Sequence, residues 1–253
     1  MLENKKFIVI GANGLLGSKV VGSILSNHGE VIAIDNDIKK LENLYKYKNP
    51  NNKKNKISIM KMDINNSISL QKLIMNSKDI SGLVNCAYLK NKNFGKKFVD
   101  VKVESFNENV SLNLGTTFNI NKLCVKWFYK YKKEFSLINI GSIYGSITPK
   151  FTIYKGTSIN PPIEYTAIKS AIIGMTKYIS AYVKNSKFRC NCVSPGGIYD
   201  NQPRKFVSKY KEHTNGIGML DALKISETII FLLSNKSDYI TGQNIIVDDG
   251  FTI

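Results

Sequence analysis

The first forty residues alternate short apolar runs with a glycine-rich turn and a helical pattern. Residues 7–10 are apolar throughout, and the run stops at Gly11. Apolar residues then recur at helical spacing over 16–25, and a second apolar run at 31–34 ends at Asp35. Strand, glycine turn, helix and strand together make a βαβ unit, so this chain is expected to build a sheet of parallel strands.

Further apolar runs follow, separated by segments long enough for helices, at residues 57–62, 83–84, 135–140, 188–193 and 245–247. Strands that are apolar throughout are expected where helices cover both faces of a parallel sheet. A length of 253 residues fits one such domain. The sequence therefore predicts an α/β fold, a Rossmann-type doubly wound parallel sheet in a single domain over residues 1–253.

Three stretches do not fit regular elements. The polar run at 49–56 is predicted to be an exposed loop, and the proline-containing stretch at 147–163 an insertion between a strand and a helix. The third, at about 196–218, follows a Pro-Gly breaker and is predicted to form a lid over the substrate. The last two leave the carboxyl ends of strands, where open α/β sheets place their ligands.

The formal net charge of +17 raises the question of a nucleic-acid or membrane partner. Of the 36 basic residues, 34 are Lys and only Arg189 and Arg204 are Arg, while Asn occurs 28 times. Base-reading surfaces favour the two-pronged guanidinium group, so scattered Lys and Asn indicate a solvated basic exterior instead. We expect neither nucleic acid nor membrane as a partner.

Four cysteines, Cys86, Cys124, Cys190 and Cys192, form no CxxC motif. We expect them to be reduced thiols, with Cys190 and Cys192 packed on one side of a strand, and we expect no metal site. The N-terminus lacks the apolar stretch of a signal peptide, and no apolar run reaches 18 residues. The expected location is the cytoplasm.

The glycine turn has the spacing Gly11-x-x-Gly14-x-x-Gly17 between the first strand and the first helix. Such a turn lets the backbone approach a pyrophosphate, which the helix N-terminus binds through free N–H groups, although similar turns also occur for packing alone. Asp35, 18 residues after Gly17, is placed to accept hydrogen bonds from the adenosine ribose. Its carboxylate would repel a 2′-phosphate, so the predicted cofactor is NAD and not NADP.

Tyr165 and Lys169 stand four residues apart in a segment with helical periodicity, so both side chains should lie on one face. A phenol must lose about three pKa units to act as a base near neutrality. A neighbouring ammonium contributes a stabilisation of that order. In isolation, a Tyr and a Lys at this spacing would usually be ordinary surface residues.

The order of these features along nearly the whole chain resembles the short-chain dehydrogenase/reductase family. The matching motifs, in family order, are Gly11 to Gly17, Asp35, Asp63-Ile64, Leu-Val-Asn85-Cys-Ala87, Leu-Asn113-Leu, Ile-Asn-Ile-Gly-Ser142, Tyr165-x-x-x-Lys169, Ser-Pro195-Gly196-Gly-Ile198 and Gly242-Gln-x-Ile-Ile-Val-Asp248-x-Gly250.

This resemblance implies catalytic roles for four residues. Tyr165 would exchange a proton with the substrate oxygen, Lys169 would lower the pKa of Tyr165 and bind the nicotinamide ribose, Ser142 would hydrogen-bond the substrate oxygen, and Asn113 would hold a water. Asp63 and Ile64 would contact adenine, and Pro195, Gly196 and Ile198 would position the carboxamide. The full set implied for the cofactor is Gly11, Asn13, Gly14, Leu16, Gly17, Asp35, Asn36, Asp63, Ile64, Asn85, Ala87, Tyr165, Lys169, Pro195, Gly196 and Ile198.

The sequence departs from the usual family pattern in four ways. The second glycine of the turn is Gly14 and not the next residue, Tyr88 replaces the glycine expected after Ala87, and Asp249 replaces a glycine in the last motif. The spacing from Ser142 to Tyr165 is also longer than in most members, because the 147–163 insertion lies between them.

The insertion and the predicted lid are rich in aromatic, amide and hydroxyl groups, which suit the apolar faces and hydroxylated rim of a sugar. Their sequences resemble a subgroup of bacterial oxidoreductases that accompany flagellin-glycosylation and surface-polysaccharide genes. The candidate substrate residues are Ser142, Tyr144, Phe151, Tyr154, Tyr199 and Asn201.

We therefore expect an NAD-dependent oxidoreductase that interconverts a secondary alcohol and a ketone on a sugar or activated sugar. The family resemblance also implies a homo-oligomer, a dimer or tetramer. One alternative is a 3-oxoacyl-(acyl-carrier-protein) reductase, whose acidic partner would suit a basic surface but whose chemistry generally uses NADPH. The other is a non-catalytic dinucleotide-binding regulator.

Overall fold

The computed structural model describes residues 1–46 and 56–253, so positions 49–55 of the predicted polar loop lie outside the described residues. Within the described residues, parallel strands form one seven-stranded sheet in the order β3-β2-β1-β4-β5-β6-β7. The strands are β1 (Lys6–Ile10), β2 (Glu30–Asp35), β3 (Ile57–Lys61), β4 (Ile80–Asn85), β5 (Phe135–Ile140), β6 (Phe188–Pro195) and β7 (Asn244–Val247). The predicted α/β parallel sheet is confirmed.

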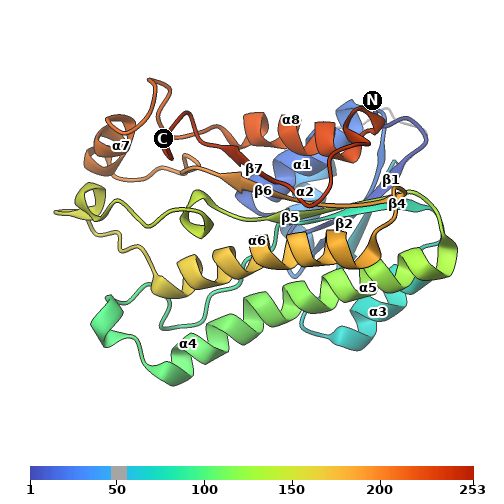
Figure 1. Cartoon of the computed structure of the whole chain (residues 1–253), viewed down its shortest axis with the longest axis horizontal. Helices are drawn as coiled ribbons and strands as arrows, with labels where there is room; N and C mark the ends of the chain where they lie inside the picture. The colour runs from blue at the N-terminus through green and yellow to red at the C-terminus, as the bar shows by residue number, and fades with distance from the viewer. Residues whose placement is uncertain (47–55) are drawn as a thin grey trace.

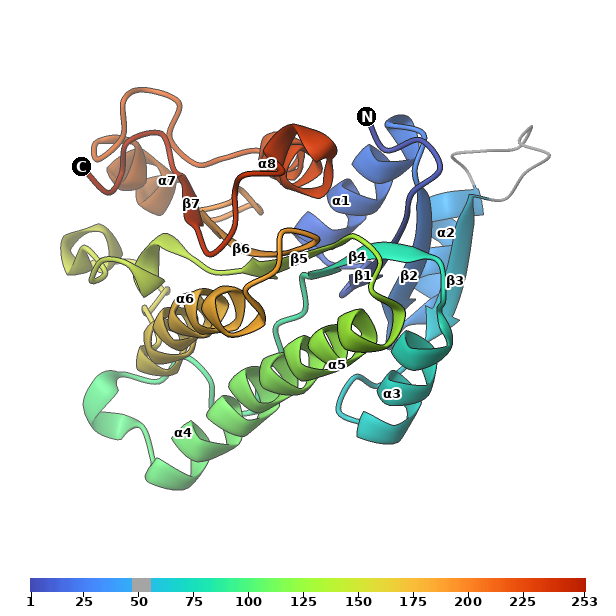
Figure 2. The same cartoon turned by 45° about the vertical axis from the view of Figure 1, so that its right-hand side comes forward.

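Helices cover both faces of the sheet (Figures 1 and 2). On one face α1 packs against α8, and on the other α5 packs against α3 and α6. The helices are α1 (Leu15–Ser26), α2 (Ile38–Lys46), α3 (Ser67–Asn76), α4 (Val103–Val110), α5 (Thr116–Tyr131), α6 (Ile163–Val183), α7 (Arg204–Lys211) and α8 (Ala222–Leu233). A π-helical turn, Ser111–Gly115, joins α4 to α5.

The central strands are buried on both faces, which explains their continuous apolar sequence. Every residue of β6 is buried, and apolar side chains from the two sheet faces belong to two separate core clusters. Arg189, one of the two arginines, is only 7% exposed and donates to the carbonyl oxygens of Leu232 and Ser234. Arg189 is therefore part of the interior and does not belong to a basic surface.

The strand order changes direction between β1 and β4, because β2 lies on one side of β1 and β4 on the other. The segments that follow β1 and β4 therefore run in opposite directions along the sheet. A crevice is expected between them at the carboxyl ends of these strands, where doubly wound proteins bind ligands. The segment 147–163, α7 and the C-terminus gather at one end of the molecule, on the left in Figure 1.

The four cysteines all lie within the described residues and are free, as predicted. Cys190 and Cys192 are both fully buried on β6. In the part of the chain that the structure describes, no helix is long and apolar enough to cross a membrane.

Candidate active site

The glycine turn after β1 brings three segments into close contact. Gly11 has φ +73°, and a Cβ there would lie 2.8 Å from the backbone N of Ala87, just after β4. A Cβ on Gly17 would lie 2.1 Å from the Gly11 carbonyl oxygen. Gly14 is the N-cap of α1, so the first N–H groups of that helix open toward the turn without intrahelical partners. This geometry suits a bound phosphate.

A cleft of about 700 Å³ opens above the carboxyl ends of β1, β2 and β4. Most of the predicted cofactor residues line it: Gly11, Asn13, Gly14, Leu16, Asp35, Asn36, Asp63, Ile64, Ala87, Tyr165, Lys169, Pro195 and Ile198. Gly17, Asn85 and Gly196 do not line it. Gly17 packs beneath the turn, Asn85 donates to the Thr117 hydroxyl, and the N–H of Gly196 donates to the Val247 carbonyl oxygen.

Asp35 and Asn13 form the polar wall of this cleft. One Asp35 carboxylate oxygen accepts from the Asn13 backbone N–H at 2.9 Å, and the other accepts from the Asn36 N–H at 2.8 Å. The second oxygen also accepts from the Asp37 N–H at 3.4 Å, so the oxygen bonded to Asn13 keeps a lone pair for a further donor, such as a ribose hydroxyl. The side-chain oxygen of Asn13 is buried and has no hydrogen-bond partner within residues 1–46 and 56–253, and such an atom is normally satisfied by a ligand or water. The residues present therefore fit a dinucleotide.

Tyr165 lies in the first turn of α6, and Ser142 follows β5. Burial raises the pKa of Tyr165, and a hydrogen bond with the Ser142 hydroxyl partly opposes this increase. Sequence reasoning predicted a pKa lowered by Lys169, and this prediction is wrong for the chain alone. Loss of hydration of the phenolate outweighs the other contributions. In the chain alone, Tyr165 is a protonated phenol held beside Ser142.

Lys169 is 4% exposed, and its Nζ donates a 2.7 Å hydrogen bond to the Ile140 carbonyl oxygen at the end of β5. Its Nζ also lies over the Tyr165 ring, 5.5 Å from the centroid. Burial lowers the pKa of Lys169 to about 8. Tyr165 and Lys169 lie on one face of the helix, as predicted. The Lys169 ammonium, however, approaches the face of the Tyr165 ring.

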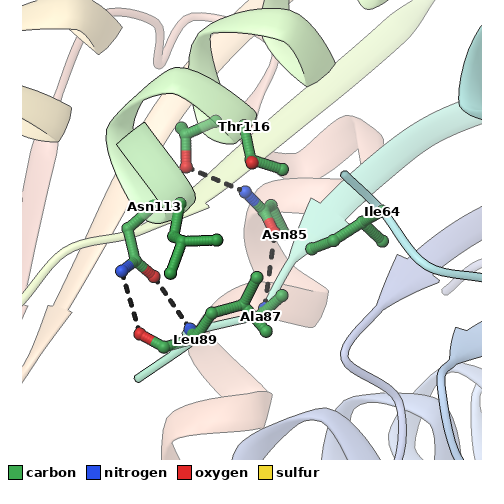
Figure 3. A pocket seen from close by; sticks show the side chains of 8 residues that line it. Ile64, Asn85, Ala87, Leu89, Asn113 and Thr116 are labelled. Atoms are coloured by element: carbon green, nitrogen blue, oxygen red, sulfur yellow. Dashed lines mark hydrogen bonds between the residues drawn. The ribbon is translucent and has the colours of Figure 1, made fainter. Parts of the chain in front are cut away.

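Asn113 sits in the π-helical turn and holds the segment that follows β4 (Figure 3). Its Oδ1 accepts from the Leu89 N–H at 2.8 Å, and its Nδ2 donates to the Leu89 carbonyl oxygen at 2.9 Å. Nδ2 also donates to the Asn109 carbonyl oxygen. The side-chain amide therefore positions backbone, and the water-holding role of Asn113 stays a prediction.

Sequence reasoning assigned no role to Tyr88, although it noted that Tyr88 stands where the family has glycine. Tyr88 lines the cleft, and its ring packs edge-on against Tyr165 with centroids 5.1 Å apart. Other cleft residues without a sequence assignment are Ile10, Leu15, Asp37, Lys40, Met62, Cys86, Leu89, Lys90, Ile140 and Gly141. Their positions beside the carboxyl ends of β1, β2, β4 and β5 were the sequence signal that could have identified them as cleft residues.

The six predicted substrate residues fall into two groups. Ser142 is buried and Tyr144 and Tyr154 are half-buried, with Tyr154 donating a 2.6 Å hydrogen bond to the Tyr144 hydroxyl. Burial raises the pKa of both phenols, that of Tyr154 to about 12, and Tyr165 contributes to both increases. The other three are exposed: Phe151 is 67% exposed, Tyr199 is 51% exposed, and Asn201 is exposed with φ +58°, and their contact with a substrate stays a prediction.

The 147–163 segment is attached to α7 by aromatic and polar contacts. The Tyr154 ring packs on Phe206 at 5.3 Å, and Lys209 Nζ donates to the carbonyl oxygens of Thr152 and Lys155. Phe206 belongs to a small buried cluster that includes Phe251 near the C-terminus. The two irregular segments therefore pack together beside the end of the cleft.

Comparison with known proteins identifies the family. Residues 12–252 match a family model described as enoyl-(acyl carrier protein) reductase. The chain belongs to the short-chain dehydrogenase/reductase family. This member is 34% identical to the post-translational flagellin modification protein A of Campylobacter coli, over 99% of both chains. It is 28% identical to the 3-oxoacyl-(acyl-carrier-protein) reductase of Buchnera aphidicola, over 98% of both chains.

Solved short-chain dehydrogenases have the same fold. The crystal structure of a short chain dehydrogenase from Leptospira borgpetersenii with bound NAD+ has a TM-score of 0.85 and 31% sequence identity, and the alignment covers 100% of this chain and 94% of that chain. The aldohexose dehydrogenase of Thermoplasma acidophilum aligns with a TM-score of 0.77 at 22% identity, over 99% of this chain and 94% of that chain, which shows likeness of fold alone.

Proposed function

We propose that this short-chain dehydrogenase/reductase is an NAD-dependent oxidoreductase that interconverts a secondary alcohol and a ketone on a sugar or activated sugar. One observation carries the proposal: the glycine turn at Gly11, the carboxylate of Asp35 and the pair Tyr165 and Lys169 all line one cleft. Phosphate-binding, ribose-binding and proton-transferring groups in a single cleft match what hydride transfer from a secondary alcohol requires.

In the proposed reaction the glycine turn at Gly11, Asp35 and Lys169 would hold NAD, which would supply the hydride acceptor for the substrate carbon. Tyr165 exchanges the proton with the substrate oxygen, and Ser142 hydrogen-bonds the same oxygen. Lys169 binds the nicotinamide ribose through its ammonium. Because burial raises the pKa of Tyr165, the phenol is protonated, which is the form that ketone reduction requires of its proton donor. Alcohol oxidation requires the positive charge of the oxidised cofactor to favour the phenolate.

The preference for NAD is proposed from Asp35. Its carboxylate is fixed at the end of β2 by the N–H groups of Asn13 and Asn36. A 2′-phosphate placed about 4 Å away would be repelled by up to about 4 kcal/mol at an effective dielectric constant of about 20. Lys40 also lines the cleft, but it is exposed and screened by solvent, so the fixed carboxylate decides the preference.

The sugar substrate is proposed from the hydroxyl pair of Tyr144 and Tyr154 and from the relative in Campylobacter coli whose name refers to flagellin modification. Because Tyr154 donates to Tyr144, the proton of the Tyr144 hydroxyl is available for an acceptor on the substrate. A sugar presents such oxygen acceptors beside apolar C–H faces, which suit aromatic rings. The corresponding process would be the synthesis of a surface glycan.

The alternative substrate is a 3-oxoacyl group on acyl carrier protein. Relatives with that name match the chain at 28% identity, and the net charge of +17 would favour an acidic carrier protein. Asp35 disfavours this alternative, because that chemistry generally uses NADPH.

A homo-oligomer, a dimer or tetramer, is proposed from the outer faces of α5 and α6. Phe118 on α5 is 54% exposed, and Tyr178 and Tyr182 on α6 are 67% and 62% exposed. Tyr178 and Tyr182 stack at 6.1 Å on the same face of α6. Exposed aromatic patches of this kind mark association surfaces. Light scattering measures the assembly, and charged substitutions at Tyr178 and Tyr182 are expected to reduce its mass.

The test of the proposed function is a substrate screen that follows NADH absorbance. Sugar phosphates and nucleotide sugars are supplied with NAD, and an acetoacetyl carrier protein is supplied with NADH or NADPH. Activity with a sugar and NAD supports the proposal. Activity confined to the acyl substrate would establish the alternative. No hydride transfer with any substrate, combined with tight NAD binding, would favour a non-catalytic regulator.

A further inference from the structure

Tyr88 contacts Tyr165, to which the proposed function assigns proton transfer, and Lys169, to which it assigns binding of the nicotinamide ribose. Its ring lies 5.1 Å from the Tyr165 ring in an edge-to-face arrangement. The Nζ of Lys169 lies over the Tyr88 ring, 5.0 Å from its centroid, and over the Tyr165 ring at 5.5 Å. The ammonium group is therefore in contact range of two aromatic faces, one from α6 and one from the segment after β4.

The charge of Lys169 has few other sources of stabilisation. Its side chain is 4% exposed, and its hydrogen bond goes to the neutral carbonyl of Ile140. The ion pairs found among the described residues do not include Lys169. The titratable groups that act on it are the thiols of Cys86 and Cys192, together with the two phenols already named. Attraction to aromatic faces is strongest for a cation removed from water in this way.

We propose that Tyr88 is a positioning residue that forms, together with Tyr165, an aromatic cage around the Lys169 ammonium and keeps this amine protonated near neutral pH. The proposal rests on the catalytic roles proposed above for Tyr165 and Lys169. It assigns a specific function to Tyr88, which stands where the family has glycine, a residue without an aromatic ring.

Two features hold the Tyr88 ring in place. Asn113 makes two hydrogen bonds with the backbone of the next residue, Leu89. The Tyr88 ring packs against a small buried cluster that includes Ile168 and Ile172 of α6. The aromatic face is therefore fixed by α6 and by the π-helical turn, independently of any ligand.

The ring of Tyr88, and not its hydroxyl, carries this role. The hydroxyl is buried and has no hydrogen-bond partner among the described residues. Burial raises the pKa of Tyr88, and Tyr165 and Glu164 raise it further, so the side chain stays a neutral phenol. A phenylalanine at this position would offer nearly the same face to the ammonium, which supplies a matched control.

The test is an NMR titration of the full-length protein labelled with ¹³C at the lysine ε-carbon, in the absence of cofactor and substrate. The Lys169 signal is identified by its loss in Lys169→Arg. The wild-type pKa of Lys169 is expected at about 8. In Tyr88→Phe it should stay within a few tenths of a unit, and in Tyr88→Leu it should fall by about one unit.

A second set of variants keeps the aromatic ring, so the test does not depend on whether Tyr88→Leu folds. Phenylalanines with one, two and three ring fluorines are incorporated at position 88; they keep the shape of the ring and progressively weaken its negative face. The pKa of Lys169 should fall with each added fluorine. An unchanged pKa across this series, or a fall in Tyr88→Phe as large as in Tyr88→Leu, would overturn the cage. The titration needs no turnover, so its outcome is independent of the substrate screen.

Discussion

The ammonium of Lys169 lies over the ring of Tyr165, 5.5 Å from its centroid, and gives its hydrogen bond to the carbonyl of Ile140. Lys169 therefore approaches the aromatic face, and burial leaves the Tyr165 phenol protonated in the chain alone. Lys169 and the glycine turn at Gly11 line the same cleft. In the proposed function, the positive charge of the bound cofactor would complete the electrostatics of proton transfer by Tyr165.

The first prediction concerns the pH dependence of NAD binding. Burial lowers the pKa of Lys169 to about 8, so the group is an ammonium below pH 8 and an amine above it. A charged donor binds ribose hydroxyls more strongly than a neutral one. Calorimetry should therefore show NAD affinity falling by roughly fivefold from pH 7 to pH 9.5. Lys169→Ala should bind weakly with little pH dependence, whereas the exposed Lys177→Ala should follow the wild type; a flat wild-type profile would refute the prediction.

The second prediction concerns cofactor choice. Asp35→Ser removes the carboxylate that would repel a 2′-phosphate and leaves a small polar side chain. The ratio of NAD affinity to NADP affinity should fall at least about tenfold, measured by cofactor titration of each protein. Asp37→Ser, a neighbour that also lines the cleft, serves as the matched control and should change the ratio less. Equal ratios in Asp35→Ser and the wild type would remove Asp35 from this role.

A third prediction tests the hydroxyl pair of Tyr144 and Tyr154 near Tyr165. Tyr154→Phe removes the donor to Tyr144, whose hydroxyl then loses its fixed orientation. For a sugar substrate found in the screen, KM should rise about two- to tenfold, the cost of one hydrogen bond, while NAD affinity stays unchanged. Tyr239→Phe, at a fully exposed position outside the proposed association surface, is the control. If KM is unaffected in Tyr154→Phe, the pair does not orient the substrate.

A matched pair of glycines in α1 gives the fourth prediction. Gly17→Ala places a methyl group 2.1 Å from the Gly11 carbonyl oxygen, so the turn must shift, at a cost of about 1–3 kcal/mol. Gly22→Ala places its methyl where no described atom lies within 4 Å apart from the chain neighbours and the backbone of the same helix, and it should stabilise the helix by about 0.5–1 kcal/mol. Thermal unfolding should therefore move Tm down in the first variant and up in the second. A higher Tm in Gly17→Ala than in Gly22→Ala would show that contact with the turn does not restrict the residue at position 17.

The sequence could predict the features that depend on local spacing. The βαβ unit, the turn at Gly11 and the position of Asp35 at the end of β2 follow from periodicity and glycine placement within forty residues. The shared helix face of Tyr165 and Lys169 follows from four-residue spacing. In these elements the structure agrees with what the sequence predicts.

What the sequence missed depends on contacts between distant segments. Asn113 binds the backbone of Leu89, 24 residues earlier, and this contact places Tyr88 against α6. The orientation of Lys169 depends on burial and on the Ile140 carbonyl, neither of which spacing reveals. The substrate candidates Phe151 and Tyr199 are both exposed, and their contact with a substrate stays a prediction.

The central claim, that the Tyr165 hydroxyl moves the proton during NAD-dependent hydride transfer, is tested most directly by Tyr165→Phe. NADH formation with the substrate found in the screen and NAD binding by calorimetry are measured on the same preparation. The account predicts that turnover falls by at least about a hundredfold, the usual contribution of a general acid–base group, while NAD affinity changes less than about threefold. Turnover at the wild-type level in Tyr165→Phe would contradict the account.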